Sequence, residues 1–210
     1  MPVASRPTRT ATRGNLLAPD ELRKHLAHPE WFHIYRDGDA TNISVNLYRV
    51  PAPDRVLVTN VTGVVSTNRQ ISLLFGQALP GSPKLSGLMN MVIPKDQLRR
   101  TIYASPQFGD QLDDYASRND VTPTKRSISA DLYPTERIVT ERASLVSIAF
   151  ANDDCEWRFY RVSPTDLRAA NEGNSGAPVL YPVVQVIMDT TELVHLMHTL
   201  KEAVPKDEGT

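Results

Sequence analysis

A serine in a glycine-bounded loop is the most reactive-looking group in the chain. Ser175 lies in the run Gly173-Asn174-Ser175-Gly176-Ala177-Pro178, where a hydroxyl and nearby backbone N–H groups could face a carbonyl carbon. Nucleophilic catalysis of this kind needs a histidine base and a carboxylate that orients the base. The loop therefore raises the hypothesis of a divergent serine hydrolase.

The run around Ser175 resembles the serine loop of chymotrypsin-like proteases, so the other members of that site were sought in the sequence. The histidines that precede Ser175 are His25, His28 and His33. The stretch 58–61 resembles the strand end that carries the base in these proteases, yet valine and threonine follow Asn60 where the histidine would stand. The sequence therefore predicts no catalytic residue, and the hydrolase remains an alternative.

Two histidines near the carboxyl end could bind a divalent metal. His195 and His198 are three residues apart on a predicted helix, and Cys155 or Glu192 could complete a ligand set. Two ligands are a weak basis for a site, so we expect both histidines to be half-exposed residues beside an apolar stripe. The sequence predicts no metal site.

Acidic side chains surround the single thiol and form two adjacent pairs. Cys155 lies among acidic neighbours, a setting that disfavours a reactive thiolate. The pairs Asp113-Asp114 and Asp153-Asp154 fall in predicted loops or turns, where they would aid solubility. Glycine-rich phosphate-binding motifs do not occur in the sequence. We therefore predict no cofactor.

Aromatic and basic residues alternate between positions 157 and 161, a pattern that could stack unpaired bases. Alternation along a strand instead places Trp157 and Phe159 inward and the arginines or Tyr160 outward. We expect the two inward rings to belong to the core.

The composition is that of a globular protein without a strong charge bias. The chain has 210 residues, of which 40% are hydrophobic, and its formal net charge is -1. Such a balance provides no field that would attract nucleic acid or an anionic membrane. The lone cysteine cannot form an internal disulfide, and we find no export signal or membrane-spanning run, so a cytoplasmic location and no membrane partner are predicted.

The first fourteen residues are rich in threonine, arginine and proline. We predict a disordered basic arm over 1–14, with Arg6, Arg9 and Arg13 as possible contacts to nucleic acid or a partner. A solvated tail without a partner is the simpler alternative. Residues 205–210 are predicted to be a similar tail.

An extension and a first unit are predicted over 15–119. The extension is a helix over 19–27 and a hairpin of strands 31–36 and 42–50. The unit then has a strand over 56–66, its hairpin partner at 70–75, a strand at 88–93 and a helix over 94–103. Residues 105–125 are polar, and we place the boundary between the halves there, near Asp120.

A second unit over 120–204 repeats this order. Strands are predicted at 142–151 and 155–162, followed by a loop over 163–178, an apolar strand and a helix opened by a capping box at 189–192. The apolar stripe of this helix consists of Leu193, Leu196, Met197, Leu200 and Val204. The prediction is an α+β fold of mainly antiparallel sheet, with two related hairpin-strand-helix units that pack on one another or on a second chain.

A set of turn, loop and helix-start residues occurs in a characteristic order within residues 56–103, namely Asn60, Ser66-Thr67-Asn68, Phe75, Leu79-Pro80-Gly81-Ser82-Pro83-Lys84, Ile93-Pro94 and Leu98. In these residues the segment resembles the bacterial and archaeal family called domain of unknown function 3467. This chain departs from the family in its amino-terminal extension and second unit. The resemblance implies a fold and no reaction. Hairpin-strand-helix units are also similar in shape to SecB-like export chaperones.

These patterns predict a non-catalytic protein-binding, chaperone-like or assembly module that acts as an oligomer. A structural protein of a virion or other large assembly, with a basic arm, is the first alternative. The partner is expected to be a protein or a second copy of the chain.

Overall fold

The computed structural model describes residues 32–37, 40–45, 50–82, 84–125, 133–134, 137–171 and 179–206. The predicted arm over 1–14 and helix over 19–27 lie outside these ranges. Strands β1 (Phe32–Asp37) and β2 (Ala40–Val45) pair antiparallel and form a two-stranded sheet. The hairpin predicted in this part of the chain is therefore confirmed.

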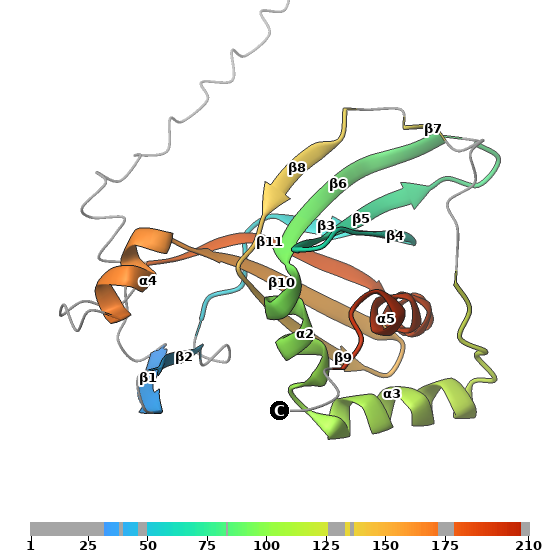
Figure 1. The fold of residues 1–210 in the computed structure, drawn as a ribbon. Helices are drawn as coiled ribbons and strands as arrows, with labels where there is room; N and C mark the ends of the chain where they lie inside the picture. Colours follow the sequence, from blue (N-terminus) through green and yellow to red (C-terminus); the bar gives the residue numbers. More distant parts are fainter. Residues whose placement is uncertain are drawn as a thin grey trace, which may run out of the picture.

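Two larger sheets make up the body of the molecule (Figure 1). In the first sheet, β4 (Val61–Ser66), β5 (Gln70–Ala78) and β6 (Lys84–Pro94) are antiparallel, and β7 (Tyr133–Pro134) and β8 (Val139–Arg142) run parallel to β6. In the second sheet, β9 (Leu145–Ala151), β10 (Asp154–Val162) and β11 (Leu180–Asp189) are antiparallel, and β3 (Val56–Val58) runs parallel to β11. The prediction of an α+β fold with mainly antiparallel sheets is confirmed.

Each unit contributes a short strand to the sheet of the other unit. The single strands predicted over 56–66 and 142–151 are wrong, because each is broken into two strands that belong to different sheets. Thus β3 leaves the first unit to pair with β11, and β8 leaves the second unit to pair with β6. This exchange joins the two units through backbone hydrogen bonds.

The chain changes sheet between two consecutive residues at both crossovers. The Thr59 N–H donates to the Ile187 carbonyl in the second sheet, and the Asn60 N–H donates to the Gly76 carbonyl in the first. The same pattern recurs at the other crossover, as the Ala143 N–H donates to the Val92 carbonyl and the Ser144 N–H to the Tyr160 carbonyl. The two crossovers therefore have equivalent backbone hydrogen bonds.

At both crossovers a side chain forms hydrogen bonds to the backbone of a neighbouring strand, which is β5 at the first crossover and β10 at the second. The Asn60 amide accepts from the Ala78 N–H at 2.8 Å and donates to the Ala78 carbonyl at 3.1 Å. At the equivalent place the Ser144 hydroxyl accepts from the Val162 N–H at 2.8 Å. Asparagine and serine side chains can replace a backbone partner in this way. Polar residues therefore mark the points where the strands break.

Helices α2 (Lys95–Tyr103) and α5 (Thr190–Ala203) follow the third antiparallel strand of each unit. Helix α5 packs chiefly on β4 and α2 on β9, so each helix covers an edge strand of the sheet (Figure 1). Asp189 caps α5 by accepting from the Thr191 N–H, which confirms one half of the predicted capping box. The predicted apolar stripe of α5 is buried along its whole length.

One hydrophobic core contains residues of both units. The inner faces of the two sheets meet at aromatic rings, where Phe75 of β5 contacts Trp157 and Phe159 of β10 with ring centroids 6.4 and 5.7 Å apart. All three rings are fully buried. Residues of the two predicted units thus pack on one another in this core, which is one of the two arrangements expected from the sequence.

Two segments predicted as loops contain helices. Residues 105–125, expected to be a polar boundary segment, include α3 (Pro106–Arg118), which buries Leu112, Tyr115 and Ala116. Residues 163–178, expected to be a loop, include α4 (Pro164–Asn171). In both helices a proline follows a serine at the start, and proline is well tolerated in the first helical turn.

Candidate functional site

The edge strands β3 and β8 carry most of the exposed apolar side chains among the residues whose burial is described. Of the six large hydrophobic residues that are exposed there, four lie on or directly beside these strands, namely Val56, Val58, Ile138 and Val139. Val56 and Val58 are 53% and 54% exposed. Each strand pairs on one side only within the described part of the chain.

An ion pair joins the two strands. The Arg55 guanidinium lies 3.5 Å from a carboxylate oxygen of Glu141, with 48% and 36% of the two side chains exposed. Since strands rise about 3.3 Å per residue, the four apolar residues lie within about 10 Å of this pair along their own strands. We call Arg55, Val56, Val58, Ile138, Val139 and Glu141 together the edge surface.

The other two edge strands are treated differently, because helices cover them. The Thr62 N–H at the outer edge of β4 donates to Glu192 of α5 at 3.2 Å, and the Thr62 hydroxyl donates to the same carboxylate oxygen at 2.7 Å. Both side chains are more than nine-tenths buried. A buried carboxylate thus satisfies the two donors of Thr62 at one sheet edge.

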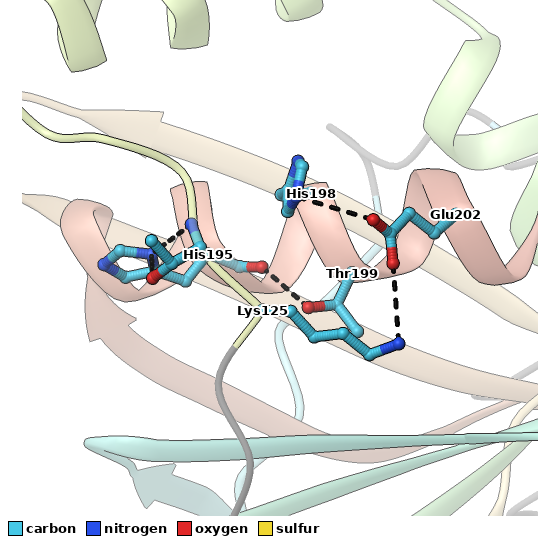
Figure 2. A network of polar contacts seen from close by, with 6 residues as sticks. Lys125, His195, His198, Thr199 and Glu202 are labelled. Carbon is cyan, nitrogen blue, oxygen red and sulfur yellow. Dashed lines mark hydrogen bonds and ion pairs between the residues drawn. The ribbon is translucent and has the colours of Figure 1, made fainter.

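A second polar contact holds the segment that follows α3 along helix α5 (Figure 2). The Thr124 N–H lies 3.2 Å from Nδ1 of His195, so this nitrogen must be the acceptor and the ring proton lies on Nε2. Lys125 and His198 each approach Glu202 at 3.6 Å. His195 is 7% exposed, and the expectation that it is half-exposed is wrong.

A shallow depression lies beside this cluster, between β4 and α5. Its lining residues are Thr62, Gly63, Val64, His195, Leu196 and Thr199. Two of the polar groups that line it form hydrogen bonds between elements. The Thr62 hydroxyl is bound to Glu192, and the His195 ring is bound to Thr124. The Thr199 hydroxyl donates to the His195 carbonyl of its own helix.

The corresponding contact between β9 and α2 lacks this pair of buried polar groups. Val146 of β9 pairs with Phe159 as Thr62 pairs with Phe75, and Gln97 precedes Leu98 as Glu192 precedes Leu193. Valine and glutamine therefore occupy the places of the hydroxyl and the carboxylate. The two ends share a backbone plan and differ in how each helix is fixed to its edge strand.

The thiol of Cys155 is part of the core. The side chain is 1% exposed, and burial raises the pKa of the thiol from 9.0 to about 12, with a smaller contribution from Glu156. The expected low reactivity therefore has burial as its main cause. Cys155 and the histidines do not form a ligand set, and the described residues contain no cluster of three or more potential metal ligands.

The aromatic and basic strand predicted at 157–161 offers no stacking platform for bases. Trp157 and Phe159 are inward, as predicted. Tyr160 is also buried, because a bulge between positions 159 and 160 turns its ring, and its hydroxyl donates to the Pro51 carbonyl at 3.3 Å. Arg158 is bound to Glu156 on the outer face, and this contact raises the pKa of the arginine.

The two acidic pairs have local structural contacts. Asp113-Asp114 lies on α3 and not in a loop, and Asp114 pairs with Arg118 at 2.8 Å one helical turn later. Asp153 accepts from the Tyr115 hydroxyl at 3.2 Å, and its carbonyl accepts the first N–H of α5. These contacts help to position helices α3 and α5.

Several predicted site residues lie outside the described residues. They are the loop 173–178 with Ser175, the arm with Arg6, Arg9 and Arg13, and the histidines at 25 and 28; His33 lies on β1, without a described side chain. The serine hydrolase and the basic arm therefore stay predictions. Among the described helices, none is long and apolar enough to cross a membrane.

Comparison with known proteins gave no relative. No family model, no curated protein and no solved structure matches the chain. The similarity to the domain of unknown function 3467 thus stays a prediction from residues 56–103.

Proposed function

We propose that this chain is a non-catalytic, cytoplasmic protein-binding module that holds a protein partner at its edge surface. The observation that carries the proposal is the gathering of four exposed apolar residues around the Arg55–Glu141 pair. Single exposed apolar residues are ordinary on protein surfaces, whereas a group of them on open sheet edges is typical of an interaction site.

The difference between covered and open edges of the two large sheets supports this assignment. Helices α5 and α2 cover β4 and β9, so these edges are closed to other chains. Strands β3 and β8 have no such helix among the described elements, and β3 carries no charged residue, a common protection of open edges. An edge of this kind can accept a partner strand through backbone hydrogen bonds.

The size and charge of the edge surface favour an assembly role over a chaperone-like one. A chaperone that takes many clients needs a broad apolar surface that can adapt, whereas this surface is short and contains a defined ion pair. Charges placed in an apolar surface select partners and fix their register. A specific protein partner therefore suits the surface best.

A charge placed on the edge surface tests the proposal. Val58→Lys is expected to reduce complex formation by at least about tenfold, because a buried, unpaired ammonium is costly. Val65→Lys is the matched control, since Val65 is a 64% exposed valine on β4, away from the edge surface. Complexes would be measured by light scattering and by capture from the native cell.

Both variants must first be shown to melt at the temperature of the parent, as expected for surface substitutions. A strictly monomeric parent that captures no protein would overturn the proposal. Equal loss of binding in Val58→Lys and Val65→Lys would do so as well, because the effect would then not belong to the edge surface.

A further inference from the structure

Strand β3 turns alternate residues toward β11, and two hydrogen bonds show which ones. The Arg55 carbonyl accepts from the Gln185 N–H at 2.8 Å, and the Thr59 N–H donates to the Ile187 carbonyl at 2.9 Å. In a parallel ladder, a residue that bonds to the neighbouring strand is followed by one whose backbone groups point the other way. Leu57, which lies between these two bonds, therefore also faces β11.

Val56 and Val58 alternate with these residues, so their N–H and carbonyl groups point to the open edge. Within the described part of the chain, no second strand pairs with β3. Each valine offers one donor and one acceptor there. An extended segment has the same groups at the same spacing and can bond to both valines. The open side of β3 is thus arranged to receive a strand.

The side chains of the two valines determine what such a strand can carry. Val56 and Val58 are more than half exposed and lie on the outer face of the second sheet, because Leu57 between them pairs with the buried Val186. Side chains directly opposite each other on neighbouring strands are about 5 Å apart, and β-branched or aromatic residues pack well in such pairs. The strand that fits therefore has apolar residues at alternate positions.

The charges around the two open edges set a second condition. Residues 54–58 and 137–142 contain three cations and two anions, namely Asp54, Arg55, Arg137, Glu141 and Arg142. Glu141 is already paired with Arg55, and both Arg137 and Arg142 are exposed. This excess of positive charge favours a partner with carboxylates. A second copy of the chain would bring the same excess and is disfavoured.

We infer that the partner at the edge surface is an extended, acidic segment of another protein, which adds to β3 as a further strand of the second sheet. This inference rests on the proposed function and names its partner. The backbone of the segment bonds to Val56 and Val58, and its alternate apolar side chains cover the two valines. Carboxylates that flank these apolar residues are attracted by the arginines of the two edges.

Hydrogen exchange with a synthetic probe tests the inference on the unaltered chain. The probe is a peptide of alternating valine and threonine with glutamates at both ends, and its control has lysines in place of the glutamates. We expect the glutamate peptide at saturation to slow exchange of the Val56 and Val58 amides at least about tenfold, because these N–H groups become hydrogen-bonded. The Leu57 amide, which faces β11, should change little.

Fluorescence anisotropy would measure the affinity of both peptides. The lysine peptide should bind at least about tenfold more weakly than the glutamate peptide, because its charges repel the arginines. Equal affinities would overturn the acidic character of the partner.

A proline on β3 separates backbone recognition from side-chain contact. Val58→Pro removes the N–H that points to the open edge and keeps the hydrogen bonds to β11, as proline on an edge strand allows. The matched variant Val58→Ala keeps the N–H and loses part of the apolar side chain. We expect the glutamate peptide to bind Val58→Pro at least about tenfold more weakly than Val58→Ala, since a peptide carbonyl loses its donor.

Both variants must melt at the parental temperature, and the exchange experiment on the parent needs neither of them. Binding that leaves exchange of the Val56 and Val58 amides unchanged would overturn strand addition. Equal or tighter binding of the peptide to a folded Val58→Pro would do the same. A parent that dimerises, with Val58→Pro monomeric, would make the occupant a second copy and overturn the choice of another protein.

Failure of the inference can be told from failure of the proposed function. If the parent binds neither peptide, the acidic strand is ruled out. The protein-binding function then stands when the parent captures a protein from the native cell and Val58→Lys abolishes that capture. If the parent captures nothing, both proposals fail together.

Discussion

At the scale of single residues, the Thr62 hydroxyl and the Glu192 carboxylate form a buried polar contact between two distant segments of the chain. The carboxylate oxygen accepts two hydrogen bonds from Thr62 and is buried between β4 and α5. We expect Thr62→Val to lower the free energy of unfolding by about 1.5–3 kcal/mol, because a bond to a charged group is lost while the shape is kept.

Urea unfolding followed by circular dichroism would measure this loss. Thr140→Val on β8 serves as the control, since Thr140 is exposed, and its effect should stay within about 0.5 kcal/mol. Equal stabilities for the two variants would contradict the assigned role of the Thr62 hydroxyl.

The buried thiol leads to a prediction about reactivity. With the pKa of Cys155 raised to about 12, about one thiol in ten thousand is ionised at pH 8 in the folded protein. A disulfide reagent should therefore leave the folded chain unmodified over hours and label it fully in denaturant. Rapid stoichiometric labelling of the folded chain would show that the side chain is accessible.

The same shift predicts how alkali acts on stability. The unfolded thiol ionises near its ordinary pKa of 9.0, whereas the folded thiol stays protonated until about pH 12. Stability from Cys155 is thus complete below pH 9 and is lost as the pH rises between these values. In urea titrations at several pH values, the free energy of unfolding of Cys155→Ala should fall less steeply over this window than that of the parent.

At the scale of the elements, the strand crossovers determine which sheet each strand joins. The Thr59 hydroxyl accepts from the Gly76 N–H at 3.0 Å, and Thr59 is 3% exposed. Thr59→Val leaves this amide without its acceptor, and we expect a loss of about 1–3 kcal/mol. Hydrogen exchange of the Gly76 amide should also be faster in this variant. The exposed control Ser66→Ala should change neither the free energy of unfolding nor this exchange rate.

Periodic elements could be predicted from the sequence, and sheet membership could not. The alternation of β5 and β10 and the stripe of α5 correspond to buried faces, as local patterns require. Valine and threonine occur on both sides of Thr59 and Asn60, so nothing local shows that the strand changes partner there. Backbone hydrogen bonds to distant strands determine that change.

Helix α3 and the contacts between distant residues could not be predicted from the sequence, for two different reasons. Polar composition concealed α3, although the spacing of Leu112, Tyr115 and Ala116 is that of one helical face. Glu192 could be assigned locally as a capping residue, yet its partner Thr62 is 130 residues away in the chain. Arg55 and Glu141 are 86 residues apart, and their meeting follows from the crossovers alone.

At the scale of the whole molecule, the exchange of β3 and β8 makes the two units parts of one folding domain. Each sheet contains a strand of the other unit, and one core holds the inner faces together. If one unit unfolded alone, the sheet of the other unit would lose the strand that the first contributes, and its apolar inner face would be exposed to water. The units should therefore unfold in a single cooperative transition.

A cavity in one unit and a fluorescent probe in the other test this cooperativity. Leu73 is fully buried on β5 of the first unit, and Leu73→Ala should cost about 2–5 kcal/mol. Trp157 on β10 reports on the second unit once Trp31, the other tryptophan, is replaced by phenylalanine. We expect Trp157 fluorescence and far-ultraviolet circular dichroism to shift together to lower urea concentration. A fluorescence transition that keeps its parental midpoint, while the dichroism signal shifts, would show that the units are independent despite their exchanged strands.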